Sequence, residues 1–221
     1  STADSTAAIT RAIASPTRPA DERARDAVRH PAEILAMLNL KPGQRLFDFV
    51  AGGGYYTRLL ADAVGPQGIV YAHSTEGLLA VDKLQPRWSV LKRDHPNVRL
   101  ILGIPGRMKL PAVDRVLMHL TFHDLWWEDA EYGIPRMDAD RFLADLHAAV
   151  APGGLVLIID HRARAGAEPR AETMAHHRID PEVVKARMEK AGFVPDGESD
   201  LLASAGDDHS RLVYDPALRG H

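Results

Sequence analysis

The strongest constraint on the fold is an alternation of short apolar runs with longer helical stretches after residue 41. Apolar spacing and helix punctuation indicate helices at 55–64, 138–150 and 181–191. The runs with the length and composition of buried strands are 45–50, 68–73, 98–103, 113–120 and 155–160. This alternation is typical of parallel βαβ units. We therefore predict an α/β fold with a Rossmann-like, doubly wound, mainly parallel sheet.

The two ends of the chain add further elements to this prediction. The segments 193–202 and 211–214 indicate a sixth and a seventh strand, so we expect six to seven strands in total. The first forty residues consist of helical turns separated by prolines, and Pro31 suits a first helical position. We assign 1–40 to an N-terminal helical extension that caps the sheet, and 41–221 to the Rossmann-like domain.

The composition excludes several classes of function. With 27 basic and 30 acidic residues, the net charge of -3 provides no broad positive surface, so nucleic acid is not expected as a partner. The absence of cysteine excludes disulfides, thiolate metal sites and a cysteine nucleophile. No apolar run approaches the roughly 18 residues that would span a bilayer, so a membrane is not expected either.

The sequence begins at Ser1 with a segment rich in alanine, serine and threonine. We expect a cytoplasmic protein, with an exported form whose signal peptide has been removed as the alternative. A homodimer is the assembly that we consider.

The segment LFDFVAGGGYYT places three consecutive glycines, 52–54, between a buried strand and an amphipathic helix. Glycines let backbone N–H groups approach a ligand closely, and the N-terminus of the helix adds donors and a favourable dipole. A dinucleotide fingerprint requires a sixth-place glycine, where this chain has Thr57. NAD is therefore disfavoured. A tight turn that binds no ligand is the alternative.

The motif Asp48-x-x-x-Gly52-x-Gly54 resembles motif I of class I S-adenosylmethionine-dependent methyltransferases. The resemblance covers roughly residues 30 to 200 and points to a bacterial branch of predicted methyltransferases. It also includes three further stretches, which are Lys41-Pro42-Gly43, Tyr55-Tyr56-Thr57 and Ala151-Pro152-Gly153-Gly154.

This resemblance implies S-adenosylmethionine as the cofactor, with Asp48 near the amino group of its methionine moiety. The residues that it assigns to cofactor binding are Asp48, Ala51, Gly52, Gly53, Gly54, Tyr56, His73 and Ser74. The chain departs from the family pattern at three places. Val50 replaces the first glycine, the second strand lacks the acid that holds the ribose hydroxyls, and 103–107 lacks an acid for adenine. His73 or Ser74 would then bond to the ribose.

Histidines gather where the fourth and fifth predicted strands end. Ligands of open parallel sheets bind at the carboxyl ends of the strands, so these positions are the leading catalytic candidates. Imidazole titrates near neutrality and suits the removal of a proton from an acceptor. We rank His123 first as general base, with Asp124 or Asp160 to orient it. The predicted catalytic residues are His123, Asp124, His161, His119 and His209.

Other interpretations of the same residues remain open. We assign no metal, although His119, His123, His161 and His209 are chemically competent ligands for a divalent ion. Phe122, Trp126, Trp127 and Tyr132 form either the wall of an aromatic acceptor pocket or a hydrophobic loop that docks on the domain. Arginines that could hold an acidic substrate, or form a solvated face, are Arg162, Arg164, Arg170 and Arg178.

We therefore predict methyl transfer from S-adenosylmethionine to a small-molecule acceptor, with an aromatic compound as candidate and a histidine as general base. One alternative is a lyase or hydrolase on the same scaffold, which would use the histidine cluster with or without a metal and without S-adenosylmethionine. Another is a non-catalytic binding protein.

Overall fold

The computed structural model describes residues 2–214, which divide into two compact units. Of the described residues, unit 1 comprises 2–103, 111–117 and 150–157. Unit 2 comprises 104–110, 118–149 and 158–214. The predicted cofactor loop belongs to unit 1 and the predicted histidine cluster to unit 2, and each unit is described separately.

Five strands form one sheet in the order β3-β2-β1-β4-β5. β1 (Arg45–Asp48) pairs in parallel with β2 (Ile69–Ser74) and with β4 (Val113–His119), and β2 pairs in parallel with β3 (Val98–Leu102). β5 (Val150–Ile159) is an edge strand beside β4. The strand order reverses at β1, which is the topological switch point of a doubly wound sheet. The predicted α/β class and Rossmann-like sheet are confirmed.

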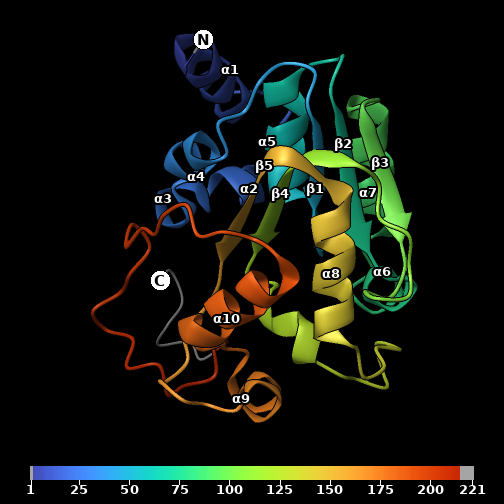
Figure 1. Cartoon of the computed structure of the whole chain (residues 1–221). Coiled ribbons are helices and arrows are strands. Elements are labelled where there is room, and N and C mark those ends of the chain that lie inside the picture. Colours follow the sequence, from blue (N-terminus) through green and yellow to red (C-terminus); the bar gives the residue numbers. More distant parts are fainter. Residues whose placement is uncertain (1, 215–221) are drawn as a thin grey trace. The chain divides into compact units, whose positions relative to one another are not determined.

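In unit 1, α5 (Tyr55–Val64) has the predicted bounds. The N-terminal helices are α1 (Thr2–Ile13), α2 (Ala20–Arg23), α3 (Asp26–Arg29) and α4 (Pro31–Met37). α1 packs against α4 and α5 (Figure 1), and it buries Ile9 and Ala12. After β2 come α6 (Glu76–Val81) and α7 (Gln85–Asp94), which the sequence interpretation did not identify.

The helices of unit 2 form two packed pairs. α8 (Ala139–Ala149) packs against α10 (Pro181–Ala191), and Arg187 on α10 is paired with Asp140 on α8 at 2.8 Å. The 3₁₀ helix η1 (His123–Trp126) packs against α9 (Pro169–His176). α10 has its predicted bounds because Pro181 occupies the first turn and Gly192, with a φ of 105°, ends it.

The predicted sixth and seventh strands are wrong, since 193–202 and 211–214 contain no strand residue. Pro195, Gly197 and several acids interrupt the first segment, and Val194 is 85% exposed instead of buried in a sheet. In the second segment, the backbone carbonyl of Arg211 accepts a hydrogen bond from the Arg178 guanidinium. The described sheet therefore has five strands instead of six or seven.

The start of the fifth strand also differs from the prediction. β5 begins at Val150, so Pro152-Gly153-Gly154 lies within the strand instead of ending the preceding helix. The φ of 74° at Gly153 accommodates the local distortion. None of the described helices has the length and apolar character needed to cross a bilayer.

Gly54 offers a test of the packing between the glycine turn and α7. Gly54 has a φ of 85°, and a Cβ atom there would overlap Leu91 Cδ1, which is fully buried. We expect Gly54→Ala to destabilise the fold by about 2–4 kcal/mol, through backbone strain and overpacking together. Urea unfolding monitored by circular dichroism measures the change.

Gly52→Ala is the matched control for this substitution. Gly52 also has a positive φ of 56°, but no atom lies within 4 Å of its added Cβ. We expect a loss of only about 1 kcal/mol from backbone strain. Equal losses for the two variants would show that Leu91 does not constrain the turn.

Candidate active site

The chain passes from β1 to α5 through a turn that repeatedly uses left-handed backbone. Val50, Gly52 and Gly54 have φ values of 47°, 56° and 85°. Glycine adopts this region without a steric penalty, whereas the β-branched Val50 is strained there. The turn is closed by a 2.9 Å hydrogen bond from the Gly54 N–H to the Ala51 carbonyl, and Gly54 is the N-cap of α5.

α7 fixes the direction of the glycine carbonyls. Trp88 Nε1 donates to the Gly52 carbonyl and Arg87 Nε donates to the Gly53 carbonyl, each at 2.9 Å. Within residues 2–214, the N–H groups of Gly52 and Gly53 have no hydrogen-bond acceptor. Because the space beside Gly52 is also open, the turn offers free backbone donors to an incoming ligand.

The N-terminal helices hold this arrangement in place through a buried acid. Glu22 on α2 is completely buried, and its Oε1 accepts from Arg87 at 2.7 Å and from Arg58 at 3.1 Å. Arg87 therefore bridges from α2 to the Gly53 carbonyl. Sequence reasoning missed both Glu22 and Arg87, because nothing in their local pattern indicates that they meet.

Asp48 lies at the end of β1 and is only 3% exposed. Thr57 Oγ1 donates to its Oδ2 at 2.6 Å. Burial raises the pKa of Asp48 to about 7, although Thr57 and the charge of Arg29 act in the opposite direction. Since a positive ligand group beside Asp48 would favour its charged form, this carboxyl suits the recognition of an ammonium group.

His73 has a different role from the predicted bond to a ribose hydroxyl. The side chain is fully buried, and both ring nitrogens bind the backbone. Nδ1 accepts from the Val50 N–H at 3.2 Å, and Nε2 lies 2.8 Å from the Gly103 carbonyl, to which it donates. Burial lowers the pKa of His73 to about 4, so the ring is neutral. His73 therefore connects the turn after β1 to the end of β3.

The remaining predicted cofactor residues lie around the same turn. Tyr56 and Ser74 are buried, and their hydroxyls point to the backbone carbonyls of Arg29 at 3.4 Å and Thr75 at 3.5 Å. The Ala51 N–H donates to the His73 carbonyl at 2.8 Å. The structure thus brings the predicted residues together, but backbone groups and Asp48 are the parts that remain suited to ligand binding.

In unit 2, Asp160 organises the start of η1. Its carboxylate accepts from His123 Nδ1 at 2.8 Å, from the His123 N–H at 2.9 Å and from the His161 N–H at 2.8 Å. His123 Nε2 lies 3.2 Å from Asp124 Oδ1. Both acids therefore contact the ring of His123, and an orienting role in catalysis for either of them stays a prediction.

The two acids also determine the protonation of His123, which is 4% exposed. Burial lowers the pKa of His123, but Asp160 and Asp124 outweigh it and raise the pKa to about 10. By contrast, burial lowers the pKa of the neighbouring His161. Within the described part of the chain, the ring of His161 makes no hydrogen bond, so its nitrogens are available.

His177 is a member of this cluster that sequence reasoning did not select. It follows α9 with a φ of 55°, and its ring centroid lies 5.4 Å from that of His123. Three potential ligand atoms lie within 4.8 Å of one another, and they belong to His123, Asp124 and His177. His119 and His209, although predicted with them, are not part of this group.

Most of the predicted aromatic side chains and two of the predicted arginines contact other residues of unit 2. Phe122 is fully buried against Trp126, while Trp127 packs against Tyr132. Arg178 forms a two-pronged ion pair with Asp207 at 2.7 and 2.8 Å. Arg170 binds Glu128 and the Trp126 carbonyl. Two of the four predicted arginines therefore stabilise the fold.

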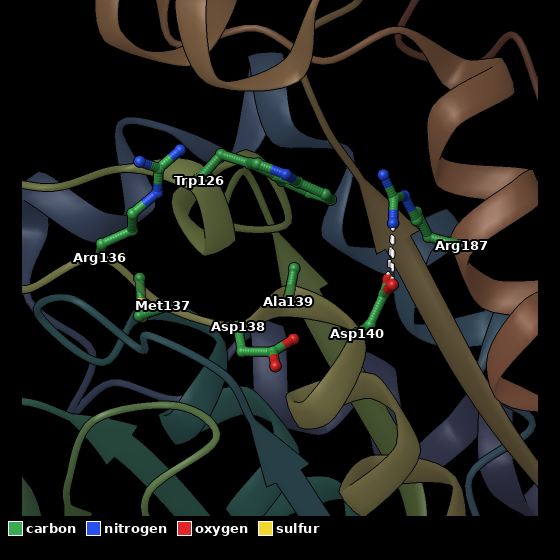
Figure 2. Close-up of a pocket in the computed structure, with 7 residues that line it drawn as sticks. All are labelled: Trp126, Arg136, Met137, Asp138, Ala139, Asp140 and Arg187. Carbon is green, nitrogen blue, oxygen red and sulfur yellow. Dashed lines mark hydrogen bonds and ion pairs between the residues drawn. The ribbon is translucent and has the colours of Figure 1, made fainter.

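Unit 2 also contains a hollow of about 430 Å³ beside Trp126. Figure 2 shows Arg136 at one side of it and the Asp140–Arg187 ion pair at the other. The lining residues are Trp126, Arg136, Met137, Asp138, Ala139, Asp140 and Arg187. Trp126 is 7% exposed and Arg136 is exposed, so the lining combines the edge of an apolar ring with a charged group.

The sheet and the turn after β1 form a Rossmann-like, doubly wound scaffold, and sequence comparison finds methyltransferases among the proteins that this chain resembles. The chain is 28% identical over 130 residues to a demethylmenaquinone methyltransferase of Geobacillus stearothermophilus, covering 58% of this chain and 50% of that protein. A demethylmenaquinone methyltransferase of Bacillus mycoides is 31% identical over 137 residues, covering 60% and 52%. The chain thus spans about half the length of these curated relatives. No family model matches it.

Comparison with solved structures gives the same fold. A S-adenosylmethionine-dependent methyltransferase from Aquifex aeolicus has a TM-score of 0.58 and 24% identity, covering 79% of this chain and 88% of that one. The sequence matches are thus to methyltransferases, and the solved structure shows the shared fold, which is the fold that the motif around Asp48 and the glycine turn predicts.

The neutral state of His73 leads to a prediction about stability and pH. An unfolded histidine titrates near 6.5, but folded His73 titrates near 4. Unfolding therefore takes up a proton below pH 6.5, and His73 destabilises the fold as pH falls, by about 2 kcal/mol at pH 5. We expect His73→Gln to be less stable than wild type at pH 7.5, with a smaller deficit at pH 5.

Urea unfolding at the two pH values measures both proteins. The control is His95→Gln, because Asp62 raises the pKa of His95 and that contribution has the opposite sign. It is present at low pH and lost as pH rises, so the deficit of His95→Gln should be larger at pH 5 than at pH 7.5. Parallel pH dependences for wild type and His73→Gln would contradict the role of His73.

Proposed function

We propose that this protein transfers the methyl group of S-adenosylmethionine to a small-molecule acceptor. The single observation that carries the proposal is the turn after β1, where free N–H groups of Gly52 and Gly53 accompany the buried Asp48. The motif resemblance and the similarity to methyltransferases in sequence and fold support it.

In this proposal, the turn in unit 1 holds the methionine end of the cofactor. The N–H groups of Gly52 and Gly53 face the carboxylate, where the N-terminus of α5 adds a favourable dipole. Asp48 binds the ammonium group in its charged form. His73 acts indirectly: it donates to the Gly103 carbonyl and accepts from the Val50 N–H, and so positions the turn.

The chemical step transfers a methyl group from the sulfonium to the acceptor nucleophile, with S-adenosylhomocysteine as the leaving group. An acceptor that carries a proton must lose it, and we assign its removal to His161. His123 was the first candidate for this base, but its Nδ1 is bound to Asp160 and its Nε2 lies beside Asp124. His161 has free ring nitrogens and a lowered pKa, so it can accept a proton.

For the acceptor, we propose a small aromatic compound bound in the hollow beside Trp126. Trp126 would contribute apolar ring atoms to this hollow, and Arg136 would offer a cation for an oxygen substituent. Demethylmenaquinone is the first acceptor to test, because the curated relatives are named for it.

Calorimetric titration with S-adenosylmethionine tests the cofactor site. Because Asp48 has a pKa near 7, it is mostly protonated at pH 6 and mostly charged at pH 7.5, where the ligand ammonium is still charged. We expect affinity to rise about five- to tenfold from pH 6 to pH 7.5. Asp48→Asn should bind more weakly at pH 7.5 and lose this pH dependence.

The control for this experiment is Asp196→Asn, which removes an exposed carboxylate of unit 2 and should bind like wild type. No heat with wild type at either pH, together with no thermal shift, would contradict the proposed cofactor. Wild-type binding that Asp48→Asn leaves unchanged would instead contradict the assignment of Asp48.

The role of His161 is tested with labelled S-adenosylmethionine and an accepted substrate. We expect His161→Ala to lower kcat about 100-fold or more, since it removes the proton acceptor, without changing cofactor affinity. His147→Gln, which alters an exposed histidine on α8, is the control and should retain wild-type kcat. A wild-type kcat for His161→Ala would show that the acceptor loses its proton elsewhere.

A further inference from the structure

We propose that His123, Asp124 and His177 form a binding site for a divalent first-row transition metal ion. This site is independent of the proposed methyl transfer, and all of its residues belong to unit 2. Two imidazoles and one carboxylate are a ligand set that suits Zn²⁺ and its neighbours in the series.

The local fold brings the three side chains together from distant parts of the chain. His123 and Asp124 begin η1, and α9 packs against η1, with Thr173 Oγ1 donating to the His123 carbonyl at 3.3 Å. His177 follows directly after α9. The hydrogen bond from the Val213 N–H to the His176 carbonyl, at 3.2 Å, holds a later segment against this end of the helix.

The hydrogen bonds indicate which atoms would bind the ion. His123 Nδ1 is bound to Asp160, which leaves Nε2 as the ligand atom. This nitrogen lies 3.2 Å from Asp124 Oδ1, close to the roughly 3.4 Å that separates two ligand atoms of a tetrahedral zinc ion. The carboxylate of Asp160 on the far side of the ring is the second partner that metal-bound histidines usually have.

His177 provides the independent observation that distinguishes a metal site from a simple ion pair. Its Nδ1 is buried and has no hydrogen-bond partner in the described structure. A buried nitrogen without a hydrogen-bond partner costs free energy. An ion pair between His123 and Asp124 alone gives no reason for His177 to place such a nitrogen beside it. One ring nitrogen of His177 belongs to the three-residue group, and a metal ion bound at Nδ1 would give this nitrogen a partner.

The charges of the cluster favour the same conclusion. Asp160 and Asp124 have side chains that are only 5% and 20% exposed. Both carboxylates lie against the ring of His123, and so bring two negative charges to this cluster. A divalent ion that replaces the proton on His123 Nε2 balances both carboxylates, with two neutral imidazoles as ligands.

Titration of the chelator-treated protein with Zn²⁺, and with Co²⁺ followed by visible absorption, tests the site. We expect one ion per chain, a rise in Tm on Zn²⁺ addition and an absorption band from Co²⁺ bound to nitrogen and oxygen. His177→Ala and Asp124→Asn should each weaken binding at least tenfold, and Asp160→Asn about 10- to 100-fold.

His147→Gln is the control and should bind like wild type. Because His123 is buried and its replacement could prevent folding, His177→Ala and Asp124→Asn carry the test, with circular dichroism to establish that they fold. Either of two results overturns the proposal. One is the absence of stoichiometric binding to wild type, and the other is binding that folded His177→Ala leaves unchanged. Neither result depends on S-adenosylmethionine, which should bind wild type equally before and after chelation.

Discussion

The turn from β1 to α5 is the constraint on which the candidate cofactor site depends. Its backbone must enter the left-handed region at Val50, Gly52 and Gly54, and valine does so with strain. The surrounding structure offsets this strain, because His73 accepts from the Val50 N–H while α7 binds the next carbonyls. Arg87 and Trp88 fix the carbonyls of Gly53 and Gly52, and this leaves the N–H groups of the same two glycines without an acceptor in the described structure.

In unit 2, the corresponding organising group is Asp160. One carboxylate binds the ring and backbone of His123 and the backbone of His161, so it fixes the start of η1 and the end of β5 together. The two histidines consequently differ in chemistry although both contact the same acid. The ring of His123 is enclosed by carboxylates, whereas the ring of His161 is free to accept a proton.

The sequence predicted most of the fold because its signals are local. The helices 55–64 and 181–191 have the predicted bounds, since a glycine turn and a proline mark their starts. The segment 193–202 has apolar residues at both of its ends, yet it forms no strand, because Pro195 and Gly197 interrupt it. Local patterns do not report whether a neighbouring strand is available for pairing.

Much of the candidate site was not predictable for the same reason. Glu22, Arg58 and Arg87 meet across more than 30 positions of sequence, and only the folded chain shows that they join α2 to the glycine turn. His177 lies 54 residues after His123 and directly follows α9, a helix that the sequence analysis does not include. The glycine motif predicts where the cofactor turn lies. It does not show that both ring nitrogens of His73 form hydrogen bonds with the backbone.

The link between Glu22 and the glycine turn affects how the limits of the functional domain should be drawn. An extension that precedes the first strand would normally be considered a removable attachment. In this protein, the buried Glu22 of the extension binds Arg87, and Arg87 in turn binds the Gly53 carbonyl of the glycine turn. Recombination or domain fusion at the junction near residue 40 would therefore separate the loop from its own support.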